Sequence, residues 1–202
     1  MPDHLIMIRS GASDFDEQGR IRGTLALPLS AAGATEARRA ATLLAASSAD
    51  ALYTSTDACA AETAHIVGAA CGLRPKRIAN LSNLDQGLWQ GMLVDEIRER
   101  QPRLYRQWQD NPWAVAPPEG ELLEEACLRV EAALEALVRR HPAGRVAVVV
   151  PQPLDHVVRW IVSGESMGDL WGGEPERPPV AEFPLAAQWR PTRRRRPTVR
   201  QR

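Results

Sequence analysis

The sequence predicts an α/β fold, a three-layer α/β/α sandwich built around a mainly parallel sheet. Apolar strands alternate with amphipathic helices along the chain, and the strands are continuously apolar, which is typical of strands covered on both faces. The 202 residues suit one domain with a substantial core, since 44% are hydrophobic and 25% are charged. In such sheets, functional residues gather beyond the carboxyl ends of the strands.

The N-terminal segment predicts a strand, a loop and a helix. Residues 5–9 (LIMIR) form a short apolar run that predicts a buried strand. The polar residues 10–30 contain three glycines and predict a long loop. Ser30 is a suitable N-cap for a helix over about 31–47, whose small apolar residues share one face.

Two further strands and a helix follow. Residues 50–55 (DALYTS) predict the second strand, and residues 57–71 a helix that ends at the following glycine. A third, short strand is expected near residues 75–79.

The second half of the chain is mainly helical, with one strong strand. Residues 93–100 and 103–109 predict short helices separated by a proline, and residues 121–140 a long amphipathic helix. The run RVAVVV at 145–150 predicts a buried strand, and residues 153–164 a further helix that ends at glycine. The proline- and glycine-rich segment after it predicts an irregular section.

Cysteines, histidines and hydropathy exclude several classes of protein. The three cysteines have no zinc-type spacing, and the four histidines are scattered, so we expect neither a metal site nor a disulfide framework nor a cofactor. No apolar run approaches the roughly 20 residues that a membrane helix needs. The N-terminus also lacks the pattern of a secretory signal. We therefore expect a cytoplasmic location and no membrane association.

Charge divides the chain into a domain over residues 1–189 and a basic tail over residues 190–202. The tail contains seven arginines and no acid, which leaves 18 basic and 25 acidic residues and a formal charge of −7 on the domain. The expected contact residues of the tail are Arg193, Arg194, Arg195 and Arg196. Such a tail can bind nucleic-acid phosphates or an acidic protein surface, or it can remain a solvated end.

Six motifs follow one another along residues 5–165. They are LIMIRSG; GRIRGTLALPLSAAGATEARRAA; ALYTSTDACAAETAHIV; LSNLDQGLWQGMLVDEI; PPEGELLEEACLRV; and RVAVVVPQPLDHVVRWIVSG. In this order they resemble motifs of the histidine phosphatase superfamily: a strand ending in R-H-G, R-x-x-G-x-x-D-x-P-L-S-x-x-G-x-x-Q-A, S-S-P-x-x-R-A-x-Q-T-A, L-R-E-x-x-x-G-x-W-E-G, P-G-G-E-S-x-x-E-x-x-x-R-V, and a last strand followed by V-S-H-G. The resemblance implies a phosphoglycerate-mutase-like fold.

The resemblance also implies a demanding chemistry. In that family a histidine attacks phosphorus and becomes a phosphohistidine. Two arginines and a second histidine hold the phosphoryl oxygens and stabilise the transition state. A carboxylate donates the proton to the leaving oxygen.

Carried over position by position, the sequence keeps only part of that set. Arg9 is in place, Glu121 remains from the G-E-S motif, and Arg22 belongs to the same vestigial phosphate pocket. The positions of the nucleophile, the second arginine, the proton donor and the second histidine hold Ser10, Cys59, Asn83 and Pro151, respectively. These four replacements remove the nucleophile, a phosphate-binding fork, an acid and an imidazole. The resemblance therefore predicts that the phosphohistidine route is lost.

Four residues are candidates to replace the missing groups. His65 and His156 lie on predicted helices, where a solvated or locally hydrogen-bonded histidine is the commoner role. Ser10 would need an adjacent base to act as a nucleophile, and none occurs among the motifs. Cys59 precedes a helix and would be either a reactive thiol or, more commonly, a buried structural one.

Anion binding without catalysis is a separate expectation. Arg9, together with the loop arginines Arg20 and Arg22, would bind an anion if the pocket stayed open. Three tryptophans would either line that pocket or pack in the core, and packing is the commoner role: Trp89, Trp108 and Trp113.

The sequence thus predicts a catalytically degenerate protein, a pseudo-phosphatase that serves as a binding or structural subunit. The expected partner is another protein or a second copy of the chain. One alternative is a phosphatase or mutase that acts on a small phosphorylated metabolite by atypical chemistry. The other is a nucleic-acid-associated protein that binds through the basic tail.

Overall fold

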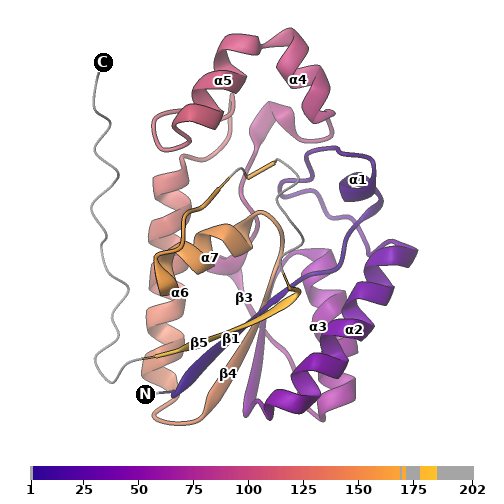
Figure 1. Cartoon of the computed structure of the whole chain (residues 1–202), viewed down its shortest axis with the longest axis vertical. Coiled ribbons are helices and arrows are strands. Elements are labelled where there is room, and N and C mark those ends of the chain that lie inside the picture. Colours follow the sequence, from indigo (N-terminus) through magenta and orange to yellow (C-terminus); the bar gives the residue numbers. More distant parts are fainter. Residues whose placement is uncertain (1, 169, 172–177, 186–202) are drawn as a thin grey trace.

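One five-stranded sheet forms the centre of the molecule (Figure 1). The computed structural model describes residues 2–168, 170–171 and 178–185. Within them the strand order is β3-β2-β4-β1-β5. The strands are β1 (His4–Arg9), β2 (Ala51–Ser55), β3 (Lys76–Ile78), β4 (Arg145–Val150) and β5 (Val180–Pro184). All neighbouring pairs are parallel except β1 and β5, which confirms the mainly parallel sheet.

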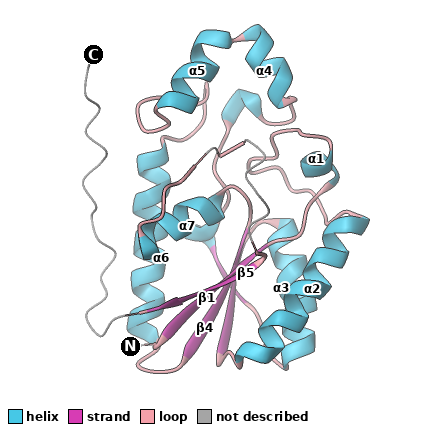
Figure 2. Cartoon of the chain, viewed as in Figure 1, coloured by secondary structure: helices cyan, strands magenta, loops and turns pink. Residues whose placement is uncertain are grey.

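Helices cover both faces of the sheet, as predicted (Figure 2). Along β1 the side chains alternate between two apolar clusters, because successive residues of a strand point to opposite faces. Ile6 and Ile8 pack with α2 (Ala31–Ser47) and α3 (Ala58–Cys71). Leu5 and Met7 pack in the cluster that contains α6 (Leu123–Arg140) and α7 (Leu154–Ser163). The three-layer sandwich is therefore confirmed.

Short elements occupy the region toward which the parallel strands point (Figure 1). They are α1 (Asp14–Glu17), α4 (Val94–Arg100), α5 (Pro102–Asp110) and the 3-10 helices η1 (Ala79–Leu81) and η2 (Gly87–Trp89). The helix α1 lies inside the predicted loop 10–30. A capping box explains it, because Ser13 and Asp16 accept each other's backbone N–H groups.

The strand β5 was not predicted and corrects the expectation of an irregular C-terminal section. Prolines at residues 178, 179 and 184 argue against a strand in the sequence. β5, however, lies at the edge of the sheet and pairs only with β1. Proline is tolerated there, because one side of an edge strand donates no hydrogen bond to the sheet.

Two glycines allow the loop after β1 to pack directly against the start of α2. A Cβ atom on Gly33 would lie 2.0 Å from the carbonyl oxygen of Ala12, and one on Gly11 would lie 2.1 Å from the carbonyl oxygen of Gly33. Both distances are far below van der Waals contact, so the approach requires glycine at both positions. The contact fixes the course of the chain just beyond Ser10.

The tryptophans pack in the core, as expected. Trp89 and Trp108 are 0% and 3% exposed, and both contact the ring of Trp171. Trp113 packs against Trp160. In the part of the chain that the structure describes, no helix combines the length and apolarity needed to cross a membrane. The residues of the predicted basic tail from 190 onward lie outside the described residues.

Candidate functional site

Arg9 and Ser10 lie at the carboxyl end of β1. The backbone N–H of Ser10 donates to the carbonyl of Val150 on β4 (2.8 Å), which continues the parallel pairing, and Ser10 is 6% exposed. The two residues line a hollow of about 390 Å³ together with Glu36 and Arg39 of α2. The position that the motif resemblance assigns to a nucleophile therefore holds a largely buried hydroxyl.

A second cavity, here called the crevice, is lined by Asp16, Arg22 and Gln152. Arg22 is the buried cation of this crevice. It is 3% exposed, and its Nη1 donates to Asp16 (3.1 Å). Its Nε lies 3.9 Å from Oδ2 of Asp57, the N-cap of α3, and its Nη2 lies 3.5 Å from the carbonyl oxygen of Gln152. Two carboxylates therefore offset the charge of the guanidinium before any anion arrives.

The second arginine position holds a buried, neutral thiol. Cys59 is 0% exposed, and its Sγ donates to the carbonyl of Leu27 (3.1 Å). Burial raises the pKa of Cys59 to about 12, although nearby Arg22 acts in the opposite direction. A thiol that stays protonated is a poor nucleophile, which favours the structural role over the reactive one.

Asn83 joins the loop before α7 to the loop after α1. Its Nδ2 donates to the carbonyl oxygens of Gly23 (2.9 Å) and Gln152 (3.1 Å), and the residue is 1% exposed. Pro151, which stands at the second histidine position, is buried immediately before Gln152. The side chain of Asn83 thus joins two backbone segments by hydrogen bonds.

Glu121 is held by an arginine rather than directed at a substrate. Its carboxylate pairs with Arg129 of α6 (2.6 Å) and accepts the N–H of Asp85 (2.9 Å). Arg129 also donates to the carbonyl oxygen of Asn83 (3.0 Å). Glu121 therefore supports the segment that carries Asn83.

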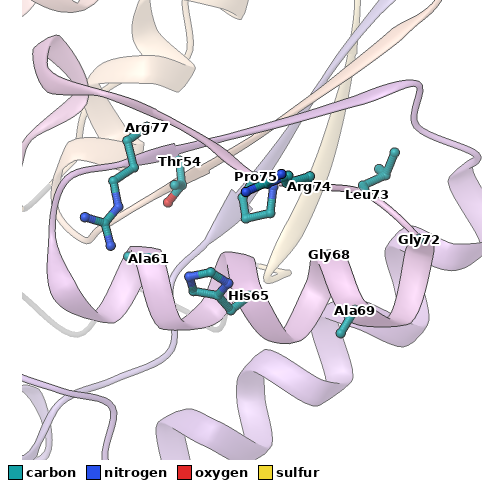
Figure 3. Close-up of a pocket in the computed structure, with 10 residues that line it drawn as sticks. All are labelled: Thr54, Ala61, His65, Gly68, Ala69, Gly72, Leu73, Arg74, Pro75 and Arg77. Atoms are coloured by element: carbon teal, nitrogen blue, oxygen red, sulfur yellow. The ribbon is translucent and has the colours of Figure 1, made fainter.

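Neither His156 nor His65 lines the hollow at Ser10 or the crevice at Arg22. His156 is 3% exposed, and its Nδ1 lies 2.6 Å from the carbonyl oxygen of Met167. His65 is exposed on α3, where it lines a groove with Arg74 and Arg77 (Figure 3). These contacts match the local roles that the sequence favoured for both residues.

The structure thus gathers part of the predicted pocket in one network. Arg22 and Asn83 meet at the carbonyl oxygen of Gln152, while Arg9 and Ser10 line the hollow beside α2. Sequence reasoning missed the carboxylates of Asp16 and Asp57. A buried arginine requires such partners, but the sequence does not show which acids supply them, because Asp57 lies at the N-cap of α3, far along the chain from Arg22.

What the crevice can hold follows from its charge. A cavity of about 140 Å³ lies beside Arg22 and is lined in part by Gln86 and Trp171. Asp16, Arg20 and Arg22 all line this cavity, so a phosphate entering it would meet one carboxylate beside two guanidiniums. Arg22 is already paired with Asp16, and Arg20 donates to Gln18 and to the carbonyl oxygen of Gly91. Among the described residues, no three His, Cys, Asp or Glu side chains gather in a metal-binding group.

Comparison with known proteins agrees with this fold. The sequence profile of the histidine phosphatase superfamily (branch 1) matches residues 5–171. The chain is 32% identical over 145 residues to phosphoserine phosphatase 1 of Hydrogenobacter thermophilus, covering 72% of this chain and 69% of that protein. It is 29% identical over 148 residues to phosphoglycerate mutase-like protein 4 of Arabidopsis thaliana, covering 72% of this chain and 64% of that protein.

Solved structures with the same fold are also found. Bacillus stearothermophilus YhfR superposes with a TM-score of 0.82 at 25% identity, covering 93% of both chains. The mycobacterial glucosyl-3-phosphoglycerate phosphatase superposes with a TM-score of 0.76 at 24% identity, covering 84% of this chain and 86% of that one. Both similarities support the phosphoglycerate-mutase-like fold.

Proposed function

Because the chain belongs to the histidine phosphatase superfamily (branch 1) but has a serine where the family has its nucleophile, we propose that it is a catalytically inactive member. It serves as a binding or structural subunit. Ser10 has no imidazole that would accept a phosphoryl group, and a serine hydroxyl needs an activating base. The Nδ1 of His156 lies 2.6 Å from the carbonyl oxygen of Met167, and His65 is exposed in a groove that neither Arg9 nor Ser10 lines.

The observation that best supports this proposal is the state of Arg22. In a phosphoryl-transfer site, cations must remain available to the developing negative charge. Here the buried guanidinium is held by Asp16 and lies near Asp57, while Asn83 supplies only an amide that cannot give up a proton near neutral pH. Cys59 adds no second cation. Arg20 also lines the crevice, but its guanidinium donates to Gln18 and to the carbonyl oxygen of Gly91. These contacts favour a crevice arranged for internal packing rather than for phosphate.

The role of a subunit requires a partner, and charge suggests what kind. The domain over residues 1–189 carries a formal charge of −7, whereas the tail carries seven arginines. Opposite charges on one chain favour association between copies, or between the tail and an acidic protein. Light scattering of the full chain and of a variant that lacks residues 190–202 tests this. A larger particle that reverts to a monomer on deletion would support self-association.

A second candidate is a phosphatase or mutase of atypical chemistry for a small phosphorylated metabolite. The named relatives favour it, since one is called a phosphoserine phosphatase and another phosphoglycerate mutase-like. In that case Ser10 would act as the nucleophile and Arg9 would hold the phosphoryl group. The hollow that these two residues share is the place for such a substrate.

The two candidates predict different results for hydrolysis of p-nitrophenyl phosphate. We expect no rate above the buffer background, because each lost electrostatic donor typically lowers the rate by about 10²–10³ and the nucleophile is also missing. Phosphoserine phosphatase 1, assayed in parallel, is the positive control. Measurable turnover that disappears in Ser10→Ala or Arg9→Ala would contradict the inactive state and support the enzyme.

The nucleic-acid alternative rests on the tail alone, which lies outside the described residues. It remains a prediction with its own test, binding to single-stranded and duplex DNA over a range of salt. Affinity that falls steeply with salt and vanishes without residues 190–202 would support it.

A further inference from the structure

A groove of about 700 Å³ lies on the flank of the sheet, between α3 and the edge formed by β2 and β3 (Figure 3). It is bounded on one side by Thr54 and Arg77, which are paired in the register of the two strands. On the other side is α3, from Ala61 to Gly72. The groove is distinct from the crevice at Arg22, and the residues that line the two do not overlap.

Thr54 lines this groove, and its hydroxyl is buried there without a hydrogen-bond partner. The residue is 1% exposed, and its Oγ1 has no hydrogen-bond partner. It follows Tyr53 on β2, which faces the opposite cluster, so the Thr54 side chain points toward α3, as Figure 3 shows. A buried hydroxyl without a partner costs about 1–3 kcal/mol. A ligand in the groove would supply that partner.

Three further groups on the groove are donors. Arg77 extends from β3 beside Thr54, His65 projects from α3, and Arg74 lies in the connection between the two elements (Figure 3). Across the described ranges, none of the three forms an ion pair or a side-chain hydrogen bond, and no acidic residue lines the groove. This is the reverse of the crevice, where carboxylates already offset Arg22.

The surface of α3 within the groove consists mainly of small residues beside His65. Ala61, Ala69 and the C-cap Gly72 contribute little or no side chain. Gly68 is buried beneath the returning backbone, since a Cβ atom there would lie 2.4 Å from the carbonyl oxygen of Leu73. Small residues of this kind leave a surface on which a planar group can lie. The groove thus combines a cationic end with an apolar floor, as small-molecule sites commonly do.

We propose that this groove binds a small organic phosphate, a phosphate monoester with a planar apolar body. The phosphoryl oxygens accept hydrogen bonds from Arg77 and Thr54, with His65 as a further donor, because a guanidinium matches phosphate geometry with paired donors. The planar body lies over the small residues of α3. The site does not rest on the proposed function, since it would bind its ligand whether or not the crevice is catalytic.

Phenyl phosphate is a suitable probe, and its binding can be followed by NMR of the isotopically labelled full chain. We expect saturable shifts at the backbone amides of Thr54, Gly68 and Arg77 and at the His65 ring. Arg77→Ala should weaken binding by about tenfold to a hundredfold, because it removes a charge-assisted hydrogen bond. Arg38→Ala, at an exposed position on α2, is the matched control and should leave the affinity unchanged.

Thr54→Val separates binding from stability. It should weaken binding by about fivefold, since it removes one neutral donor. The melting temperature of the free protein should not fall, because the valine replaces an unpartnered hydroxyl with a methyl group of similar shape. A lower melting temperature would show that the hydroxyl has a structural partner and would overturn its assignment to a ligand.

Three results would overturn the site itself. The first is an absence of saturable shifts around the groove. The second is unchanged affinity in Arg77→Ala. The third is shifts confined to Ser10, Gly11 and Arg22, which would place the phosphate in the hollow at Ser10 or in the crevice at Arg22. If inorganic phosphate bound as tightly as phenyl phosphate, the role given to the α3 surface would be wrong.

Discussion

Replacing Trp89 with alanine is expected to lower the free energy of unfolding by about 3–5 kcal/mol. Trp89 is 0% exposed and contacts Trp108 and Trp171 edge to face, with ring centroids 6.1 and 5.1 Å apart. Its Nε1 donates to Oε1 of Gln101 (3.1 Å), which joins the helices η2 and α5. Truncation removes a large apolar surface, leaves a cavity and strands the amide oxygen of Gln101.

Chemical denaturation measures this loss, and the adjacent residue supplies the control. Leu88 lies in the same 3-10 helix, η2, but is 59% exposed, so Leu88→Ala should change the stability by less than about 0.5 kcal/mol. A loss below about 1 kcal/mol in Trp89→Ala would mean that the tryptophan cluster does not form part of the core that the structure describes.

Replacing Arg22 with methionine is expected to cost about 3 kcal/mol at neutral pH, because it leaves a buried carboxylate without its cation. The side chain of Asp57 is 4% exposed and lies 3.9 Å from the arginine. Asp16, whose side chain is 29% exposed, contributes less because water reaches it. A methionine fills similar volume, so the loss reports charge rather than packing.

The loss of stability in Arg22→Met depends on pH, and the pKa of Asp57 sets the direction of that dependence. Burial raises the pKa of Asp57, and the Arg22 guanidinium opposes that rise. Without the arginine, the pKa of Asp57 in the folded protein rises further above its value in the unfolded chain, which is about 3.9. The folded state then binds a proton more readily, so stability is retained at low pH and lost as the pH rises through the folded pKa. The loss in Arg22→Met should therefore be smaller near pH 4 than at pH 7.

Two further variants test this account of the charge. Asp57→Asn keeps an oxygen that can cap α3 through the N–H of Ala60 but removes the negative charge. Added to Arg22→Met, it should recover much of the lost stability at pH 7. Arg38→Met, at an exposed position, should have little effect. If the double variant is no more stable than Arg22→Met, the arginine acts through packing instead.

Most of the fold was predictable because its pattern is local. The apolar runs at residues 5–9 and 145–150 are strands that become buried on both faces, and the amphipathic residues 121–140 form the helix α6, which begins at Leu123. The strand β5 was not predictable from its own residues. Its pairing with β1 depends on an edge position that only the folded sheet creates.

The sequence shows which side chains stand at the matched motif positions, but not what those side chains contact. The motif resemblance assigns Ser10, Cys59, Asn83 and Pro151 to the positions of the family's functional residues. It does not show that Asn83 joins two backbone segments, or that Arg22 meets carboxylates from two different parts of the chain. These contacts depend on three-dimensional proximity. The unpartnered hydroxyl of Thr54 likewise emerges only when β2, β3 and α3 come together.

The central claim is that the end of β1 cannot hold a covalent phosphoryl group on an imidazole. Incubating the full chain with a labelled phosphoryl donor and analysing the protein for acid-labile phosphohistidine tests it most directly. We expect no labelled histidine, under conditions in which phosphoserine phosphatase 1 serves as the parallel control. A stoichiometric phosphohistidine on this chain, at His65, His156 or any other position, would contradict the account.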